Sequence, residues 1–206
     1  AHVFGFTPNY TIYQPSDTKS LLKAIIKERG LDDKVYKPAL LADRISEAKN
    51  MLVSPKKYME NIEVAKRDAQ DTIPLTGEIY NEYFGRCHKA NAMDFDDLLL
   101  FTYILFSCYP EVKQRYSEKF RYILVDEYQD TNQVQNVIFN AISDGGRKLF
   151  QVGDVKQSIY RFRLADPTIF LEKYRRFSDG DSAAEGEPRR RVLSRNFRSR
   201  GKILRA

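Results

Sequence analysis

The sequence between positions 123 and 130 is Ile123-Leu124-Val125-Asp126-Glu127-Tyr128-Gln129-Asp130. Its apolar start is short, β-branched and bounded by charged residues, which predicts a buried strand. Two adjacent carboxylates, Asp126 and Glu127, follow at the end of this strand. Ligands bind beyond the carboxyl ends of strands in open α/β sheets, so these acids are candidates for a functional site. One carboxylate there can hold Mg²⁺, and its neighbour can orient and deprotonate a water molecule.

A plainer interpretation is that the two acids only end a strand and begin a turn. The sequence that follows favours the functional interpretation. The cap residue Thr131 predicts the start of a helix with an apolar face. A turn is predicted at residues 144–146, and a second apolar strand from Leu149 to Val152. Two strands separated by a helix and about 20 residues are typical of a parallel βαβ unit.

A second polar segment follows this second strand. Gly153 permits a tight turn at the same edge of the sheet, and Gln157 is a neutral side chain able to contact a phosphate or an attacking water. Further on, Tyr160 and Phe162 offer aromatic faces and Arg163 a cation. Aromatic faces can stack on the bases of a single strand, with about 1–3 kcal/mol for each base. Taken alone, the two aromatic residues are more readily explained as core residues.

Four segments of the chain resemble, in order, motifs of the UvrD/Rep/PcrA helicases of superfamily 1. Residues 125–132 resemble motif II, residues 153–163 motif III and residues 193–199 motif IV. Residues 93–99 resemble the segment where the chain re-enters the first motor domain. Four ordered motifs at suitable spacings make a chance agreement very improbable. The segments read Met93-Asp94-Phe95-Asp96-Asp97-Leu98-Leu99, Val125-Asp126-Glu127-Tyr128-Gln129-Asp130-Thr131-Asn132, Gly153-Asp154-Val155-Lys156-Gln157-Ser158-Ile159-Tyr160-Arg161-Phe162-Arg163 and Leu193-Ser194-Arg195-Asn196-Phe197-Arg198-Ser199.

The resemblance implies an α/β fold: a partial P-loop NTPase (RecA-like) parallel sheet with an inserted all-α subdomain. Residues 1–93 resemble the inserted subdomain only loosely, but their apolar residues recur with helical spacing. Helices are expected after the cap residues Ser16-Asp17, from Pro38, from Ser54-Pro55 and after Thr76-Gly77, with a short extended piece at residues 10–13. Residues 94–206 would form the C-terminal part of the first RecA-like motor domain.

Three further elements are expected in this second part. The apolar run from Leu98 to Phe106 predicts a buried helix, and a later helix should start at Asp166-Pro167. The small, acidic residues 178–188 predict a surface loop. Val192-Leu193 then suggests a third strand.

The resemblance also implies an ATP site. Asp126 would bind Mg²⁺, and Glu127 would be the general base for ATP hydrolysis. Gln157 would sense the γ-phosphate of ATP and couple it to DNA contacts. Phe197 would pack on the adenine, and Arg198 would reach the γ-phosphate, where a delocalised cation offsets transition-state charge. Without the motif, Arg198 could equally be a solvated arginine in a basic run.

For DNA, the resemblance implies that Tyr160 and Phe162 lie against bases, with Arg163 nearby. The partners would be single-stranded DNA and its junctions with duplex, the direction 3′→5′, and the process repair or recombination. Residues 153–167 are more similar to the AddA helicase-nuclease subunit than to UvrD. An AddA-like protein would also have a helicase-nuclease partner subunit. The short helical insertion is UvrD-like, so the subfamily stays open.

No Gly-x-x-x-x-Gly-Lys-Ser/Thr sequence, the loop that cradles phosphates, occurs in the 206 residues. We therefore expect this chain to be an internal piece of a longer helicase, unable by itself to hydrolyse ATP or unwind DNA. Missing strands of the parallel sheet would leave sheet edges and apolar surface exposed. The helical part would be the more self-sufficient half.

Composition restricts the remaining possibilities. No apolar run approaches the roughly 20 residues that a membrane span needs, and no signal peptide is predicted. Cys87 and Cys108 have neither metal-ligand nor disulfide spacing, which indicates reduced thiols and a cytoplasmic protein. The net charge of +6 weakly favours a polyanionic partner.

Two other functions are compatible with parts of the sequence. One is a non-catalytic DNA-binding or protein-interaction module built on the helical part, which leaves the helicase order of the polar residues unexplained. The other is a metal-dependent phosphohydrolase that uses Asp94, Asp96 and Asp97 with the two acids of the strand. Acids at positions 94–97 are better explained as the cap of a helix whose positive end they stabilise.

Overall fold

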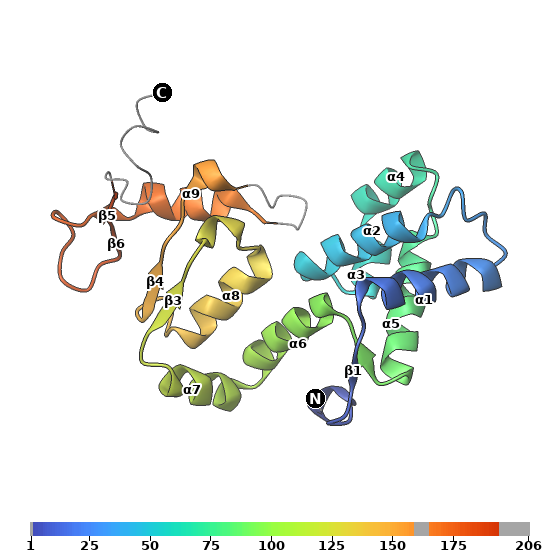
Figure 1. Cartoon of the computed structure of the whole chain (residues 1–206), viewed down its shortest axis with the longest axis horizontal. Coiled ribbons are helices and arrows are strands. Elements are labelled where there is room, and N and C mark those ends of the chain that lie inside the picture. Colours follow the sequence, from blue (N-terminus) through green and yellow to red (C-terminus); the bar gives the residue numbers. More distant parts are fainter. Residues whose placement is uncertain (1, 159–164, 194–206) are drawn as a thin grey trace, which may run out of the picture.

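A computed structural model describes residues 2–158 and 165–193 of the chain. Its two parts lie side by side, a helical part at one end and a smaller α/β part at the other, with helix α6 between them (Figure 1). The elements of the helical part are η1 (His2–Phe4), β1 (Thr11–Ile12), α1 (Pro15–Glu28), α2 (Pro38–Asn50), α3 (Pro55–Glu60), α4 (Ile62–Gln70), α5 (Thr76–Lys89) and β2 (Ala92–Met93).

The helix starts of this part follow local rules. Proline opens α1, α2 and α3, where its fixed φ suits the first turn and its missing N–H is not needed. Ser54 caps α3 by accepting a hydrogen bond from the Lys57 amide. The N-cap of α1 is Gln14, two residues before the predicted caps Ser16-Asp17; Asp17 instead completes a capping box from inside the helix. The extended piece expected at residues 10–13 is β1, which pairs in parallel with β2.

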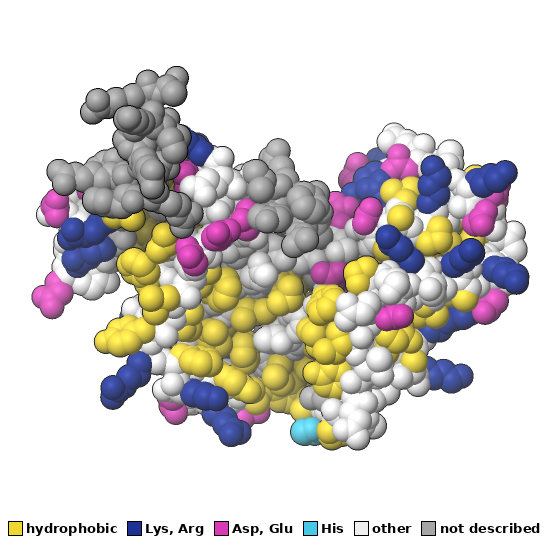
Figure 2. Space-filling view, viewed as in Figure 1, with side chains coloured by type: hydrophobic (Ala, Val, Ile, Leu, Met, Phe, Trp, Pro, Cys, Tyr) yellow, Lys and Arg dark blue, Asp and Glu magenta, His cyan; other side chains and the backbone are white. Residues whose placement is uncertain are grey.

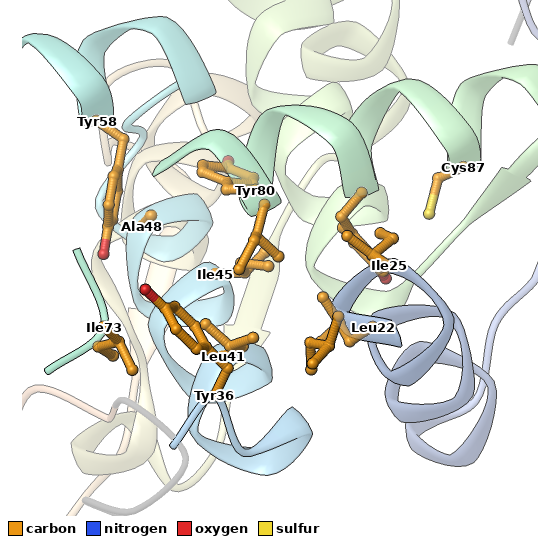
Figure 3. Close-up of a cluster of buried hydrophobic side chains, with 13 residues drawn as sticks. Leu22, Ile25, Tyr36, Leu41, Ile45, Ala48, Tyr58, Ile73, Tyr80 and Cys87 are labelled. Carbon is orange, nitrogen blue, oxygen red and sulfur yellow. The ribbon is translucent and has the colours of Figure 1, made fainter. Parts of the chain in front are cut away.

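The main hydrophobic core lies within the helical part. Its buried side chains come from α1, α2, α3, α5 and the loops between them, and Figure 3 shows them converging between these helices. They are Leu22, Ile25, Ile26, Tyr36, Leu41, Ile45, Ala48, Tyr58, Ile73, Ile79, Tyr80, Tyr83 and Cys87. A contiguous apolar cluster of this kind is what an independent core needs.

The second part is built around a parallel strand–helix–strand unit. Strands β3 and β4 pair in parallel, with Ile123 opposite Leu149 and Val125 opposite Gln151, and α8 connects them. The predicted βαβ unit is therefore confirmed. Its elements are α6 (Phe95–Cys108), α7 (Pro110–Lys119), β3 (Ile123–Val125), η2 (Tyr128–Asp130), α8 (Gln133–Ile142), β4 (Leu149–Gln151), η3 (Val155–Gln157), α9 (Pro167–Arg176), β5 (Ser178–Asp179) and β6 (Arg189–Arg190).

Three local predictions for this part were wrong. The expected strand at Val192-Leu193 is exposed coil; the strand lies earlier, in β6, and pairs with β5 inside the expected loop. The cap of α8 is Asn132 instead of Thr131, because Asn132 and Gln135 form a reciprocal capping box. Helix α6 is present, but among its residues from Leu98 to Phe106 only Leu100 is buried.

One face of the β3–β4 sheet is open to solvent. Side chains alternate across a strand, and the outward ones, Leu124 and Phe150, are 73% and 61% exposed. Figure 2 shows hydrophobic side chains gathered over this part of the molecule. The expected exposure of apolar surface is thus observed, and the prediction that β3 is a buried strand was wrong, because no residue of β3 is buried. Among the helices that the structure describes, none combines the length and apolar character needed to cross a membrane.

Candidate functional site

The two acids that follow β3 face an open cleft. Asp126 and Glu127 are both exposed, and Asp126 Oδ1 accepts a hydrogen bond of 2.9 Å from the Glu127 amide. The cleft, of about 760 Å³, lies between α2, α6 and the carboxyl end of β3. Its lining residues are Asp43, Ser46, Asn50, Asp96, Leu99, Val125, Asp126, Glu127, Asp130, Thr131, Asn132, Gln135 and Phe139.

The backbone of Glu127 has an unusual conformation, with φ of 50° and ψ of 41° in the left-handed region. Among the described residues, four other non-glycine residues have positive φ. Each of those four lies just past the C-terminus of a helix, where left-handed residues are common. Glu127 instead follows a strand. Strain of this kind concentrates at functional sites, and no sequence pattern predicts it at Glu127.

Polar contacts join the segment after β3 to the segment after β4. The Tyr128 amide donates to the Val152 carbonyl at 2.8 Å, and the Asp154 amide donates to Gln129 Oε1 at 3.0 Å. Gln129 is buried, so its side chain is a fixed link between the two polar segments predicted from sequence.

Gly153 lies directly beneath this link. A Cβ atom on Gly153 would stand 2.6 Å from Gln129 Oε1 and 3.0 Å from the ring of Phe170. The glycine is therefore required by close packing of the two segments, where the sequence suggested a tight turn.

We expect Gly153→Ala to lower the free energy of unfolding by about 1–3 kcal/mol, because an extra methyl group must displace a buried side chain. Urea unfolding followed by circular dichroism measures this loss. Gly85→Ala is the matched control: no atom lies within 4 Å of the added Cβ, and alanine favours helix α5 by up to about 1 kcal/mol. Equal stability of the two variants would contradict the close approach.

The predicted phosphate sensor Gln157 is exposed in η3 and does not line the cleft. Its Nε2 donates to Asp154 Oδ2 at 3.0 Å. This hydrogen bond, with that from the Lys156 amide, lowers the pKa of Asp154 below its usual value. The remaining predicted site residues lie outside the described part of the chain: Tyr160, Phe162, Arg163, Phe197 and Arg198.

Helix α9 holds the turn after Glu127 from the other side. Lys173 Nζ lies 4.6 Å from the ring centroid of Tyr128, a favourable cation–π distance. The same amine donates to Asn136 Oδ1 at 3.1 Å and to Gln151 Oε1 at 3.2 Å. Burial lowers the pKa of Lys173 to about 8. This lysine, not identified from sequence, packs α9 against the turn that follows Glu127.

The acids at positions 94–97 have a structural role. Asp94 accepts from the Asp97 amide, and Asp97 accepts from the Asp94 amide, which forms the capping box of α6. Lys49 makes ion pairs with both. The capping interpretation is confirmed. Within residues 2–158 and 165–193 no group of three or more His, Cys, Asp or Glu side chains is arranged to hold a metal ion.

A parallel βαβ unit with acids at its carboxyl edge, joined to a helical part, is the arrangement expected of an α/β helicase N-terminal domain. Comparison with family models supports this class directly: the UvrD/REP helicase N-terminal domain matches residues 1–178. The chain belongs to the UvrD/REP helicase family.

Two relatives are similar in sequence to this chain over all or nearly all of its length. The ATP-dependent DNA helicase UvrD1 of Mycobacterium tuberculosis (strain ATCC 25618 / H37Rv) is 36% identical over 213 residues, which cover 100% of this chain and 26% of UvrD1. The ATP-dependent DNA helicase PcrA of Bacillus subtilis (strain 168) is 36% identical over 202 residues, 98% of this chain and 25% of PcrA. The chain thus spans about a quarter of the length of the curated relatives it matches.

Proposed function

We propose that this chain is part of the motor of an ATP-dependent 3′→5′ DNA helicase or translocase, which couples ATP hydrolysis to movement on single-stranded DNA in repair or recombination. Residues 1–93 would be the inserted helical subdomain, and residues 94–206 the C-terminal part of a RecA-like P-loop domain in the cytoplasm. The observation that best supports this proposal is that Asp126 and Glu127 are exposed at the cleft where β3 ends, in a chain of this family.

The two acids suit different tasks in ATP hydrolysis. Asp126 offers an exposed carboxylate, the kind of ligand that Mg²⁺ takes alongside phosphate oxygens and water. When bound, Mg²⁺ would neutralise charge on the phosphates. Glu127 would orient the attacking water and accept its proton. Its left-handed backbone sets the direction of the Cα–Cβ bond from which that carboxylate extends.

Three more residues of this chain would contribute to the nucleotide site. Gln157 would sense the γ-phosphate and relay its presence through Asp154 and Gln129 to the turn that carries Glu127. Phe197 would pack on the adenine and Arg198 would offset charge on the γ-phosphate. Both assignments rest on the family motifs.

The DNA contacts would come from the segment after η3. Tyr160 and Phe162 would stack on bases of single-stranded DNA, and Arg163 would lie beside them. The relatives UvrD1 and PcrA are named ATP-dependent DNA helicases, which supports DNA as the partner. Single-stranded DNA, its junctions with duplex and, in an AddA-like protein, a nuclease partner subunit are proposed from the motifs.

We expect the 206-residue chain alone to release no phosphate from ATP, with or without single-stranded DNA, because it carries no P-loop sequence. A polypeptide that joins this chain to its P-loop should hydrolyse ATP and be stimulated by single-stranded DNA. A phosphate-release assay on both tests the proposal. Turnover by the chain alone, or none by the longer polypeptide, would overturn it.

The alternative, a non-catalytic DNA-binding or interaction module, draws on one observation: the main hydrophobic core lies within the helical part. This alternative requires residues 1–93 to bind DNA or protein without any dependence on nucleotide. A nucleotide-dependent change in DNA affinity of the longer polypeptide would reject it.

A further inference from the structure

A fully buried lysine lies where the helical part meets the α/β part. The side chain of Lys49, near the end of α2, is 0% exposed. Its Nζ lies 2.6 Å from Asp94 Oδ2 and 2.7 Å from Asp97 Oδ1, at the start of α6. The hydroxyl of Tyr83 donates to the same Asp94 oxygen at 2.8 Å. This ion cluster fixes the end of α2 on the start of α6.

The next residue, Asn50, extends the polar contact toward the functional turn. Its Nδ2 donates to Asp96 Oδ1 at 2.8 Å and to the Ser46 carbonyl at 2.9 Å. Its Oδ1 accepts a hydrogen bond of 2.6 Å from Asn132 Nδ2. Asn132 is the N-cap of α8 and lies five positions after Glu127. One amide side chain therefore joins α2, α6 and the N-terminus of α8, which begins six positions after Glu127.

The position of these contacts points to a role beyond packing. Asn50, Asp96 and Asn132 line the same cleft as Asp126 and Glu127. Buried ion pairs contribute little net stability relative to apolar residues, and their best-attested role is to fix one arrangement. Asn50 satisfies donors and acceptors on three elements at once, so it fixes the register between them.

We propose that Asn50, anchored by Lys49, is a positioning residue that holds the turn bearing Asp126 and Glu127 in register with the inserted helical part. For its effect on turnover, the inference rests on the proposed function. For the register itself it does not, because the hydrogen bonds belong to the chain alone.

The first test is amide hydrogen exchange of residues 126–136 in the 206-residue chain. Asn50→Asp keeps an acceptor for Asn132 but places a second carboxylate against Asp96. We expect exchange in this segment to become about tenfold faster, with α1 unchanged. The double variant Asn50→Asp with Asp96→Asn swaps the amide and the carboxylate and should restore protection.

A matched control is Asn81→Asp, since Asn81 is exposed on α5; exchange in residues 126–136 should not change. Unchanged exchange in Asn50→Asp, or a double variant as fast as the single one, would overturn the proposal. So would faster exchange throughout α1, because it would show general destabilisation.

The second test is kinetic and uses the polypeptide that includes the P-loop. Asn50→Asp should lower kcat for DNA-stimulated ATP hydrolysis about tenfold and leave KM for ATP within about twofold, and the swapped pair should recover kcat. A normal kcat together with faster exchange would show a structural role only and overturn the positioning role. A wild-type polypeptide without turnover would count against the proposed function, while hydrogen exchange would still decide on the register.

Discussion

Glu127→Gln should abolish ATP turnover while ATP still binds, in a polypeptide that joins this chain to its P-loop. An amide of the same size can hold the attacking water but cannot accept its proton, and a lost general base lowers rates by about 10²–10⁴-fold. Steady-state hydrolysis with saturating single-stranded DNA measures the rate. Equilibrium binding of a fluorescent ATP analogue measures the affinity, which should stay within about threefold of wild type.

Glu63→Gln is the matched control, because its side chain is 81% exposed on α4, in the helical part. Its turnover should equal that of wild type. Unchanged turnover in Glu127→Gln would remove Glu127 from its role as the base. If Glu127→Gln lost ATP binding as well as turnover, the result would show that the carboxylate maintains the left-handed turn. It would not support a role of the carboxylate in proton transfer.

The parts of the site predictable from sequence are those whose signal is local. The run from Ile123 to Val125 and the acids after it lie within a few residues, so one strand and its carboxyl end explain them. The second strand and the helix between follow from periodicity in the same way. The cap of α8 was predicted one residue too early, at Thr131, because both threonine and asparagine can cap a helix. Asn132 is the cap because its side chain forms reciprocal hydrogen bonds with Gln135.

The parts that could not be predicted depend on distant residues. Lys49 continues a helix whose apolar face includes Ile45 and Ala48, and lysine on a helix is normally a solvated residue. Its burial follows only from carboxylates 45 and 48 positions away that meet it in space. The prediction of a strand at residues 192–193 was wrong for a related reason. Residues with high β-propensity form a strand only where a partner strand is available.

The end of α2 should be the most sensitive position for stability. Lys49→Met removes the cation and leaves Asp94 and Asp97 buried without a counter-charge, which we expect to cost about 3–5 kcal/mol near neutral pH. Urea unfolding of the 206-residue chain measures this loss. Lys56→Met is the matched control: the Lys56 side chain is 84% exposed, and its loss should cost less than about 0.5 kcal/mol.

The pH dependence of the Lys49→Met variant separates charge from packing. In the wild type, burial and then the nearby Asp94 carboxylate raise the pKa of Asp97 to about 6, despite the opposing effect of Lys49. Burial also opposes ionisation of Asp94, but the attraction of Lys49 outweighs it and lowers that pKa. Without the lysine both carboxyl groups should have raised pKa values in the folded state.

Groups whose folded pKa exceeds the unfolded value bind protons more tightly when folded, so they stabilise the fold at low pH and lose this effect as pH rises through the folded pKa. The deficit of Lys49→Met relative to wild type should therefore shrink between pH 8 and pH 5, as the orphaned carboxyl groups become protonated. Tyr83, whose hydroxyl donates to Asp94, stays protonated throughout because burial raises its pKa. A deficit that is the same at both pH values would mean that the lysine stabilises through its hydrocarbon chain alone, and the ion cluster would then not be what holds α2 on α6.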